Sequence, residues 1–351
     1  MISYDIVEFG KGLSPLRRPV PVPAGCEVVM RVAAAGVCHT DVHTRSGSYD
    51  LGGGNALRMQ ERGITLPLTL GHEIVGDVVS VGPEVDAALI GRRYLVYPWI
   101  GCGSCERCAS GEDNMCAAPR SLGIFRAGGY SDHVLVPDAR YLVDIGELSP
   151  EAAAPLACSG LTSFSALRRI APATLARGPI VVIGAGGLGL MSVRLLRAMG
   201  GAGAIVLDIA ETKREAALEA GALAAFDPRA ADMQASVHAA AGGRVCAVLD
   251  LVGSAETVQL GLDLLGKGGQ LLLVGLAGGE LNVSLPLLPL RALKIEGCYV
   301  GSLGELRDLV DLVQRAGLPP LPTCCRPLAQ AESALADLEA GRVIGRIVLV
   351  P

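Results

Sequence analysis

Aromatic residues are scarce in this chain and make up 3% of its 351 residues. Half of the residues are nevertheless hydrophobic, so a core must be built from Val, Leu, Ile and Ala rather than from aromatic rings. The length exceeds what one compact core usually serves, so we expect two domains. Glycine is abundant, with 46 residues, but it shows no period and does not indicate a collagen-like or repeat architecture.

Runs of basic residues are also missing, and the net charge is −5. This argues against a nucleic-acid surface and against an anchor for anionic membranes. No uninterrupted apolar stretch reaches the ~20 residues that a spanning helix needs, and residues 1–8 lack the basic and apolar regions of a signal peptide. We therefore expect a cytoplasmic protein whose eleven cysteines are metal ligands or reduced thiols rather than disulfides.

A short segment near the N-terminus concentrates chemically active side chains. A thiol, a hydroxyl, a carboxylate and two histidines lie between Cys38 and His43, and His72 follows in Gly71-His72-Glu73. A catalytic zinc commonly takes three protein ligands from Cys, His and carboxylate and leaves one position open. Cys38 and His72 are therefore candidate ligands, and the third has to be found elsewhere. From these residues alone, ordinary buried packing explains the segment equally well.

The most specific motif consists of four cysteines separated by three, three and eight positions: Cys102, Cys105, Cys108 and Cys116. Four thiolates at these spacings can surround one tetrahedral ion, which predicts a closed, structural zinc site in a lobe of about residues 101–117. An iron–sulfur cluster also uses four cysteines, and four free thiols are a further alternative. Ferredoxins with similar spacings are short chains that repeat the motif, so we favour zinc.

A dinucleotide-binding unit is indicated further along the chain. A short apolar strand at 179–183 is followed by a glycine-rich turn, a helical run at 190–199 and a second strand at 204–207. In this arrangement Gly184 permits the tight turn, Gly186 lets the backbone approach the pyrophosphate, and Gly189 allows the helix to pack closely on the strand. The expected cofactor contacts of the turn are Gly184, Gly186, Gly187, Leu188 and Gly189.

Asp208 ends the second strand of this unit, nineteen residues after Gly189. A carboxylate here would accept hydrogen bonds from the ribose hydroxyls and would repel a 2′-phosphate, so NAD is favoured over NADP. The alternative interpretation of Asp208 is a helix cap or a turn residue.

The rest of the chain is predicted from its periodicity. Strands are expected at 27–34, 74–81 and 91–97, with a surface loop at 46–65 that has room for one helical turn. The alternation of strands and helices then continues with a helix at 213–220, strands at 247–250, 269–275 and 294–297, helices at 306–315 and 331–340, and a strand at 346–350.

Together these motifs resemble the zinc-dependent alcohol dehydrogenases of the medium-chain dehydrogenase/reductase superfamily, from near Val28 to the C-terminus. The resemblance rests on 36–43, 71–73, the four-cysteine lobe, Cys158 and the glycine-rich turn with Asp208. It implies an α/β protein with a GroES-like, mostly β catalytic domain and a Rossmann domain with a doubly wound parallel sheet. The expected parts are 1–154, 155–297 and a return to the catalytic domain at 298–351.

The resemblance also implies the third ligand of the catalytic zinc, Cys158, where polyol dehydrogenases tend to carry a carboxylate. A spare buried thiol is the alternative. Thr40 matches the hydroxyl that binds the substrate oxygen, and His43 matches the histidine that relays the alcohol proton to solvent; a turn hydroxyl and a structural histidine are the alternatives. Asp41 matches a partner that orients His72.

Two further roles are implied less directly. Glu73 resembles the family's acid near the zinc, and its alternative is a buried ion pair with an arginine. Lys213 matches a basic residue that contacts the adenosine ribose, and its alternative is a solvated helix lysine. Tyr49, Trp99 and Tyr299 are candidates for the wall of the substrate pocket, or for plain packing.

The function implied is reversible hydride transfer between a zinc-bound primary or secondary alcohol and NAD, with two zinc ions per chain and a small-molecule substrate. Relatives form homodimers or homotetramers, so we expect a homo-oligomer. The alternatives are another oxidoreductase of this fold, such as a polyol or aldehyde-oxidising dehydrogenase, and a non-catalytic redox sensor that binds NAD and zinc.

Overall fold

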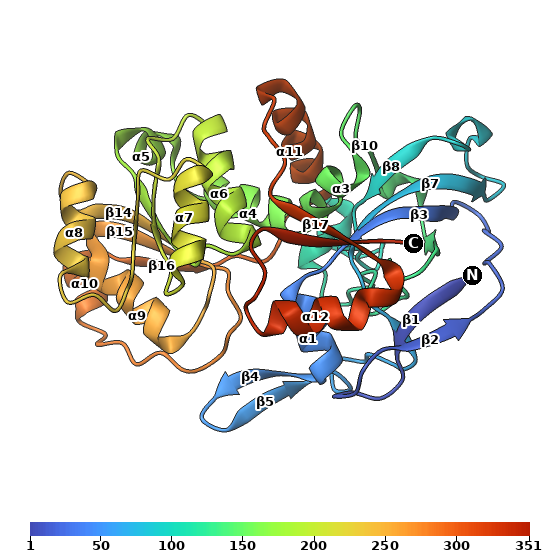
Figure 1. Ribbon diagram of the computed structural model, residues 1–351, viewed down its shortest axis with the longest axis horizontal. Helices are drawn as coiled ribbons and strands as arrows, with labels where there is room; N and C mark the ends of the chain where they lie inside the picture. Colours follow the sequence, from blue (N-terminus) through green and yellow to red (C-terminus); the bar gives the residue numbers. More distant parts are fainter. The chain divides into compact units, whose positions relative to one another are not determined.

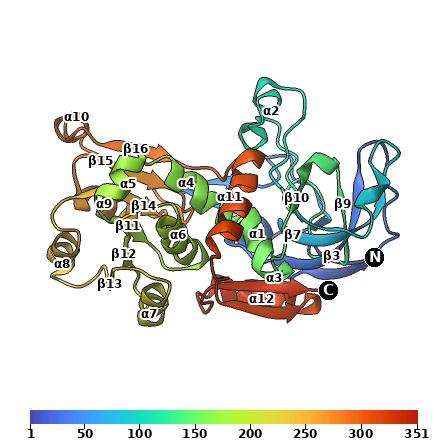
Figure 2. The same cartoon turned by 90° about the horizontal axis from the view of Figure 1, so that it is seen from above.

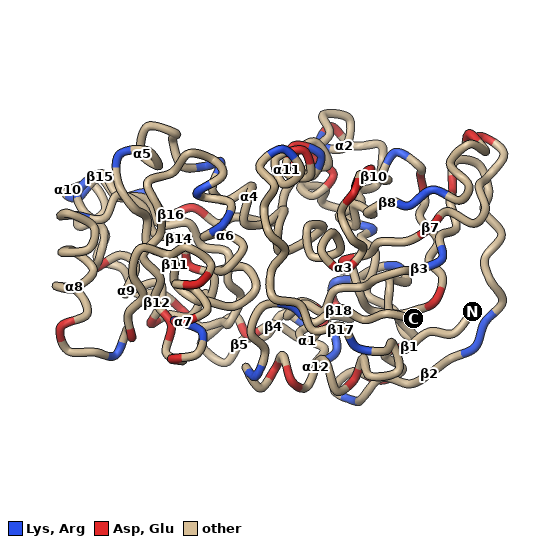
Figure 3. Tube along the Cα trace, turned by 45° about the horizontal axis from the view of Figure 1, so that its top comes forward, with Lys and Arg blue, Asp and Glu red and all other residues tan.

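The chain forms two units in the computed structural model, which describes residues 1–351 (Figure 1). Unit 1 contains Met1–Ser48, Leu57–Leu161 and Gly301–Pro351, and unit 2 contains Tyr49–Ala56 and Thr162–Val300. Unit 1 is thus built from both ends of the chain. None of the helices combines the length and the apolar character that crossing a membrane requires. Basic and acidic residues are interspersed along the chain of both units (Figure 3).

Unit 1 is organised around a mixed sheet with the strand order β10-β8-β7-β3-β18-β17, in which β9 also pairs with β3. A smaller sheet has the order β2-β1-β6. The strands are β1 (Ile2–Ile6), β2 (Ser14–Arg17), β3 (Val28–Gly36), β6 (Leu68–Thr69), β7 (Glu73–Val81), β8 (Arg93–Val96), β9 (His133–Val136), β10 (Leu142–Asp144), β17 (Thr323–Pro327) and β18 (Arg346–Val350).

The helices of unit 1 are short apart from two near the C-terminus. They are α1 (His39–Ser46), η1 (Ala87–Leu89), α2 (Glu106–Ala109), η2 (Asp113–Met115), η3 (Ala139–Tyr141), α3 (Pro150–Ala153), η4 (Ala154–Ala157), α11 (Leu303–Ala316), η5 (Leu328–Gln330) and α12 (Ala331–Glu339). Figure 2 shows α2 at the outer end of a lobe that projects from the strands of this unit.

Unit 2 contains a six-stranded parallel sheet with the order β13-β12-β11-β14-β15-β16. Helices α6 (Gly187–Ala198) and α7 (Glu211–Glu219) lie on one face of the sheet, and α8 (Met233–Ala240) and α9 (Ala255–Leu264) lie on the other (Figures 1 and 2). The strands are β11 (Ile180–Ile183), β12 (Ala204–Leu207), β13 (Ala224–Phe226), β14 (Val245–Asp250), β15 (Leu265–Leu273) and β16 (Lys294–Gly297). The predicted doubly wound sheet is therefore present, and 294–297 is its last strand.

The helices of unit 2 begin with α4 (Ser159–Arg168), whose first residues belong to unit 1. The others are α5 (Pro172–Arg177), α6 (Gly187–Ala198), α7 (Glu211–Glu219), α8 (Met233–Ala240), α9 (Ala255–Leu264) and α10 (Leu287–Arg291). Strands β11, β12, β14 and β15 and helices α8 and α9 supply a core of aliphatic residues and one methionine, without a fully buried ring. The scarcity of aromatic residues is met here by Val, Ile and Leu.

The stretch 46–65 differs from the predicted loop. It contains a β-hairpin, β4 (Ser48–Gly52) and β5 (Asn55–Arg58), which pair with each other. Gly53 and Gly54 both have positive φ, 57° and 79°, and they make the reversal between the strands. A side chain at Gly52 would lie 2.4 Å from Glu280 Cγ, so hairpin residues 49–56 pack within unit 2. The prediction missed the hairpin because three consecutive glycines look like a loop.

Candidate metal and cofactor sites

Antiparallel pairing of β3 with β7 brings the two predicted zinc ligands together. Gly36, the last residue of β3, lies opposite Glu73, the first residue of β7. Cys38 and His72 flank these paired residues and therefore meet at the same end of the sheet. A side chain at Gly36 would lie 1.9 Å from Glu73 Oε2, so this close approach requires glycine.

Cys158 reaches the same place from a different part of the chain. It caps the C-terminal end of η4, a 3₁₀ helix that contacts β3 and β7. Its Sγ lies 3.8 Å from Cys38 Sγ, and both side chains are buried. The ligand atoms of Cys38, His72, Glu73 and Cys158 all lie within 4.8 Å of one another.

His72 offers the clearest test of whether these residues fit a zinc ion. The residue is fully buried, its Nδ1 lies 3.2 Å from Asp41 Oδ1, and its Nε2 has no hydrogen-bond partner. Buried polar atoms without a partner are rare in native proteins. Two sulfurs at about 2.3 Å from a tetrahedral zinc lie about 3.8 Å apart, which matches Cys38 and Cys158. The Cys₂His donor set therefore fits a zinc ion held by three protein ligands.

Asp41 fixes the orientation of this group. It is fully buried, and its carboxylate accepts hydrogen bonds from the Cys38 N–H at 3.0 Å, the Gly71 N–H at 3.1 Å and the Tyr130 hydroxyl at 3.0 Å. The same carboxylate lies against His72 Nδ1. One side chain thus positions both predicted ligands, because a carboxylate can accept several donors at once.

Glu73 forms a buried salt bridge with Arg346, the arginine pairing considered as the alternative for this residue. Arg346 reaches it because β18 pairs with the end of β3, with Val348 opposite Gly36. Burial raises the pKa of Glu73 to about 7, although the Arg346 charge opposes this shift. Nothing in the local sequence marks Arg346 as the partner, which lies 273 positions away.

The predicted proton-handling residues lie on α1, directly after Cys38. Thr40 is in the first turn and His43 one turn later, and both are half-buried. Burial and the neighbouring His39 lower the pKa of His43 below its ordinary value. The imidazole is consequently neutral at pH 7 and can accept a proton.

The three predicted pocket-wall residues differ in their surroundings. Trp99 is buried; its ring centroid lies 5.2 Å from that of His72, and its Nε1 donates to the carbonyl of Ala157 at 2.9 Å. Trp99 therefore supports the segment that ends in Cys158. Tyr49 lies on β4 and Tyr299 is 45% exposed, and their role in a pocket remains a prediction.

The four cysteines of the lobe also converge. Cys105 Sγ lies 3.6 Å from Cys108 Sγ and 3.7 Å from Cys116 Sγ, and Cys102 Sγ lies 4.0 Å from Cys108 Sγ. These separations are close to the ~3.8 Å edge of a tetrahedral zinc–thiolate site. A side chain at Gly101 would lie 2.4 Å from Cys108 Sγ, so the turn into the lobe has room only for glycine. The donor set fits one zinc ion with no open position.

Backbone N–H groups point at these sulfurs as they do in thiolate sites. The N–H groups of Cys102 and Ala118 donate to Cys116 Sγ at 3.2 and 3.3 Å, and that of Ser104 donates to Cys102 Sγ at 3.5 Å. Backbone and hydroxyl donors of Ser104 lower the pKa of Cys102 to about 5. Asp113, inside the lobe, accepts a hydrogen bond from the Tyr141 hydroxyl at 2.9 Å. This contact ties the lobe to the rest of unit 1.

The glycine-rich turn of unit 2 has the geometry that dinucleotide binding requires. Gly184 follows β11 with φ +95°, and α6 begins at Gly187 with Gly186 as its N-cap. A side chain at Gly189 would lie 2.0 Å from the Gly184 carbonyl oxygen, whereas one at Gly186 would meet nothing within 4 Å. The open space at Gly186 lies at a helix N-terminus, where a phosphate is stabilised by N–H groups and the helix dipole.

Asp208 is held in place by the backbone on both sides of it. Its Oδ2 accepts from the Ala185 N–H at 2.8 Å, and its Oδ1 accepts from the Ala210 N–H at 2.9 Å. The carboxylate is therefore hydrogen-bonded both to the glycine-rich turn and to the residue that precedes α7. Lys213 is half-buried on α7 and forms no ion pair.

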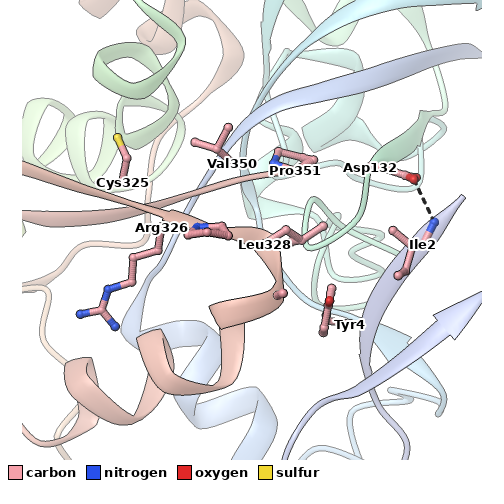
Figure 4. Close-up of a pocket in the computed structure, with 10 residues that line it drawn as sticks. Ile2, Tyr4, Asp132, Cys325, Arg326, Leu328, Val350 and Pro351 are labelled. Atoms are coloured by element: carbon pink, nitrogen blue, oxygen red, sulfur yellow. Dashed lines mark hydrogen bonds between the residues drawn. The ribbon is translucent and has the colours of Figure 1, made fainter.

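A surface pocket of about 660 Å³ lies in unit 1 away from every predicted site residue. Figure 4 shows it between the first strand and the C-terminal strands, with the Asp132 carboxylate bonded to the Ile2 N–H. Arg326 at its edge forms an ion pair with Asp337. Its walls are otherwise apolar, and it has no part in the sites described above.

Comparisons with known proteins agree with this geometry. The family model described as "Alcohol dehydrogenase GroES-like domain" matches residues 24–147, and the model described as "Zinc-binding dehydrogenase" matches 187–315. The chain is 38% identical to proteins named NAD-dependent alcohol dehydrogenase from Sulfurisphaera tokodaii and Saccharolobus solfataricus, in each case over 100% of both chains. The structure is similar to the alcohol dehydrogenase of Aeropyrum pernix, with a TM-score of 0.89, 32% identity and full coverage of both chains.

Proposed function

Because the chain belongs to the zinc-dependent alcohol dehydrogenases of the medium-chain dehydrogenase/reductase superfamily, we propose that it oxidises a primary or secondary alcohol reversibly to an aldehyde or ketone with NAD. The observation that carries this proposal is the buried His72 Nε2, which lacks a partner beside the sulfurs of Cys38 and Cys158. Buried polar atoms without a partner are rare in native proteins, and this one lies beside two sulfurs at the separation expected for zinc ligands.

Cys38, His72 and Cys158 would hold the catalytic zinc, and Asp41 would orient His72 through its Nδ1. A zinc ion bound there supplies a Lewis acid that lowers the pKa of an alcohol hydroxyl. Thr40 would bind the substrate oxygen, and the neutral His43 would accept the proton and pass it to solvent. Glu73, neutralised in part by Arg346, would set the electrostatic potential beside the ligands.

Unit 2 would bind NAD at the end of β11. The N–H groups at the start of α6 would take the pyrophosphate across Gly186, and Asp208 would accept from the adenosine ribose hydroxyls. NAD supplies the acceptor for the hydride that leaves the substrate carbon. The protein's contribution is to bind and orient this cofactor through Gly184, Gly187, Leu188, Gly189 and Lys213.

The lobe of Cys102, Cys105, Cys108 and Cys116 would hold a second, structural zinc. The distances between its sulfurs and the N–H donors aimed at them support this proposal. A cytoplasmic location and a homodimer or homotetramer belong to the same proposal. Metal analysis of the purified protein tests the two zinc ions, light scattering tests the oligomeric state, and cell fractionation tests the location.

The decisive experiment measures zinc per chain and NADH formation on a panel of primary, secondary and polyol substrates. Two zinc ions with turnover of simple alcohols are expected. Turnover restricted to polyols would favour a polyol dehydrogenase, and two zinc ions with NAD binding but no turnover of any alcohol or aldehyde would favour the redox sensor. Retention of a single zinc in the lobe would overturn the catalytic site.

A further inference from the structure

Two carboxylates lie side by side at the end of the parallel sheet in unit 2. Strands β12 and β13 pair with Leu207 opposite Phe226, and each of these residues is followed by an aspartate, Asp208 and Asp227. The carboxyl ends of parallel strands share one edge of a sheet. Both carboxylates therefore border the proposed position of the adenosine ribose beside Asp208. Of these two carboxylates, the sequence motif indicates only Asp208.

Two arginines converge on the same edge. Arg229 makes a bidentate contact with Asp227: its Nε donates to Oδ1 at 2.9 Å and its Nη2 donates to Oδ2 at 2.7 Å. The Nη2 group also donates to the Ile209 carbonyl at 3.1 Å. Arg214 Nη1 donates to the carbonyls of Asp208 and Ile209 at 2.9 and 3.0 Å. The same atom lies 3.7 Å from Asp227 Oδ2.

Two guanidinium groups around one point are the arrangement that proteins use to bind a phosphate dianion. Here Asp227 occupies that point. The two arginines and the two aspartates cancel in charge, so a phosphate on the ribose 2′-hydroxyl would meet carboxylates and guanidinium groups that are already paired. An unmodified ribose needs only the acceptor of Asp208.

We propose that Asp227 is a specificity-determining residue: it engages Arg214 and Arg229, and so closes a 2′-phosphate site that these arginines would otherwise form. The inference rests on the proposed binding of NAD beside Asp208. It assigns the exclusion of NADP to two carboxylates on neighbouring strands rather than to Asp208 alone.

An ordinary surface ion pair is the competing explanation, since the Arg229 side chain is 67% exposed. Exposed pairs contribute little to stability, so removal of the Asp227 charge should leave the fold intact under either explanation. The two explanations differ in the affinity for a 2′-phosphate, which a purely structural pair would not change.

The test measures binding of 2′,5′-ADP and of 5′-AMP to the full-length protein by calorimetry, together with NADH and NADPH titrations. Asp227→Asn is expected to raise the affinity for 2′,5′-ADP about tenfold, the effect of removing one charge close to a dianion. Affinity for 5′-AMP should stay within about twofold. Asp263→Asn, an equal charge change at an exposed residue of α9, is the matched control and should change neither affinity.

The role of the arginines is tested by adding Arg214→Gln and Arg229→Gln to Asp227→Asn, which should abolish the gain. A gain that survives in this triple variant, or no gain in Asp227→Asn and Asp227→Ser, would overturn the inference while leaving NAD binding intact. Failure of the wild-type protein to bind NADH or 5′-AMP would instead refute the proposed function. Asp227→Ser serves as the second variant if Asp227→Asn folds poorly.

Discussion

Tyr130 donates its hydroxyl hydrogen to Asp41 Oδ2 at 3.0 Å, in a position where neither side chain is exposed. Burial and the Asp41 carboxylate hold the pKa of Tyr130 well above its ordinary value, so the hydroxyl remains a donor. A side chain at Gly71 would lie 2.4 Å from Tyr130 Cδ1. The glycine before His72 therefore makes room for the ring that holds Asp41 in place.

Tyr130→Phe should destabilise unit 1 and lower its affinity for the proposed catalytic zinc. Loss of a hydrogen bond to a buried charge costs about 1.5–3 kcal/mol, which urea unfolding of the zinc-loaded protein would measure. Tyr97→Phe is the matched control, because the Tyr97 hydroxyl donates at 2.9 Å to a neutral acceptor, the Gly301 carbonyl. Equal zinc retention in the two variants would contradict the proposed link from Tyr130 to the metal.

Asp41→Asn should lower the affinity for the catalytic zinc by about 10–100-fold, as observed when the partner of a ligating histidine is changed. An amide accepts fewer hydrogen bonds than the four donors around Asp41 require. Zinc per chain during timed exposure to a chelator measures the effect. Asp5→Asn removes another buried carboxylate, bonded to Thr69 at 2.8 Å, and should destabilise the protein without releasing this zinc faster.

Much of the fold was predictable because periodicity and glycine placement are local signals. The strand–turn–helix order around Gly184 to Asp208 appears in the structure as β11, α6 and β12, and the predicted strands 74–81 and 346–350 correspond to β7 and β18 within a residue. Helices α8 and α9 were not predicted. They span only 8 and 10 residues, which is too short to show a clear helical period, and the sheet stabilises them.

The contacts within the site were predictable where the residues belong to recognisable motifs, and not where they depend on strand register alone. Asp41 and His72 could be paired from motifs, but the Glu73–Arg346 salt bridge depends on the pairing of β18 with β3. The arginines around Asp227 depend in the same way on the register of β12 and β13. Residues that act through strand register leave no local pattern to find.

Replacement of single cysteines should separate the two metal sites. Cys158→Ser should leave one zinc per chain and lower kcat at least about a hundredfold, since it removes a proposed ligand of the zinc that would activate the alcohol. Cys105→Ser should release the other zinc and lower the melting temperature, because a closed zinc site contributes directly to folding. Elemental analysis with steady-state kinetics checks both. Full activity in Cys158→Ser would refute its assignment as a ligand.

Two glycines of the nucleotide turn should respond differently to alanine. At Gly189 the new methyl group would lie 2.0 Å from the Gly184 carbonyl oxygen, so we expect a loss of about 1–3 kcal/mol in stability. At Gly186 no atom lies within 4 Å, so Gly186→Ala should fold normally and bind NADH at least about tenfold more weakly, because the methyl group fills the place of the pyrophosphate. Wild-type NADH affinity in Gly186→Ala would exclude this turn as the phosphate site.

His43→Gln should slow alcohol oxidation at neutral pH and change its pH profile. Burial and His39 lower the pKa of His43 below 6.5, so the imidazole is neutral at pH 7 and gains a proton only as the pH falls through its lowered pKa. The wild-type rate should therefore decline on that acid side, and the variant should lose this limb. At pH 7 we expect a decrease of at least about tenfold in kcat, because a positioned base is missing.

The loss in His43→Gln should become smaller as the pH rises, since hydroxide then accepts the proton directly. A lowered folded-state pKa also means that the unfolded chain binds more protons at this site between that pKa and 6.5. The contribution of His43 to stability accordingly falls as the pH drops through this range. His133→Gln is the control, because His133 is the first residue of β9 and its Nδ1 lies 2.9 Å from Asp132 Oδ1, away from α1. An unchanged pH–kcat profile in His43→Gln would show that the proton leaves by another route.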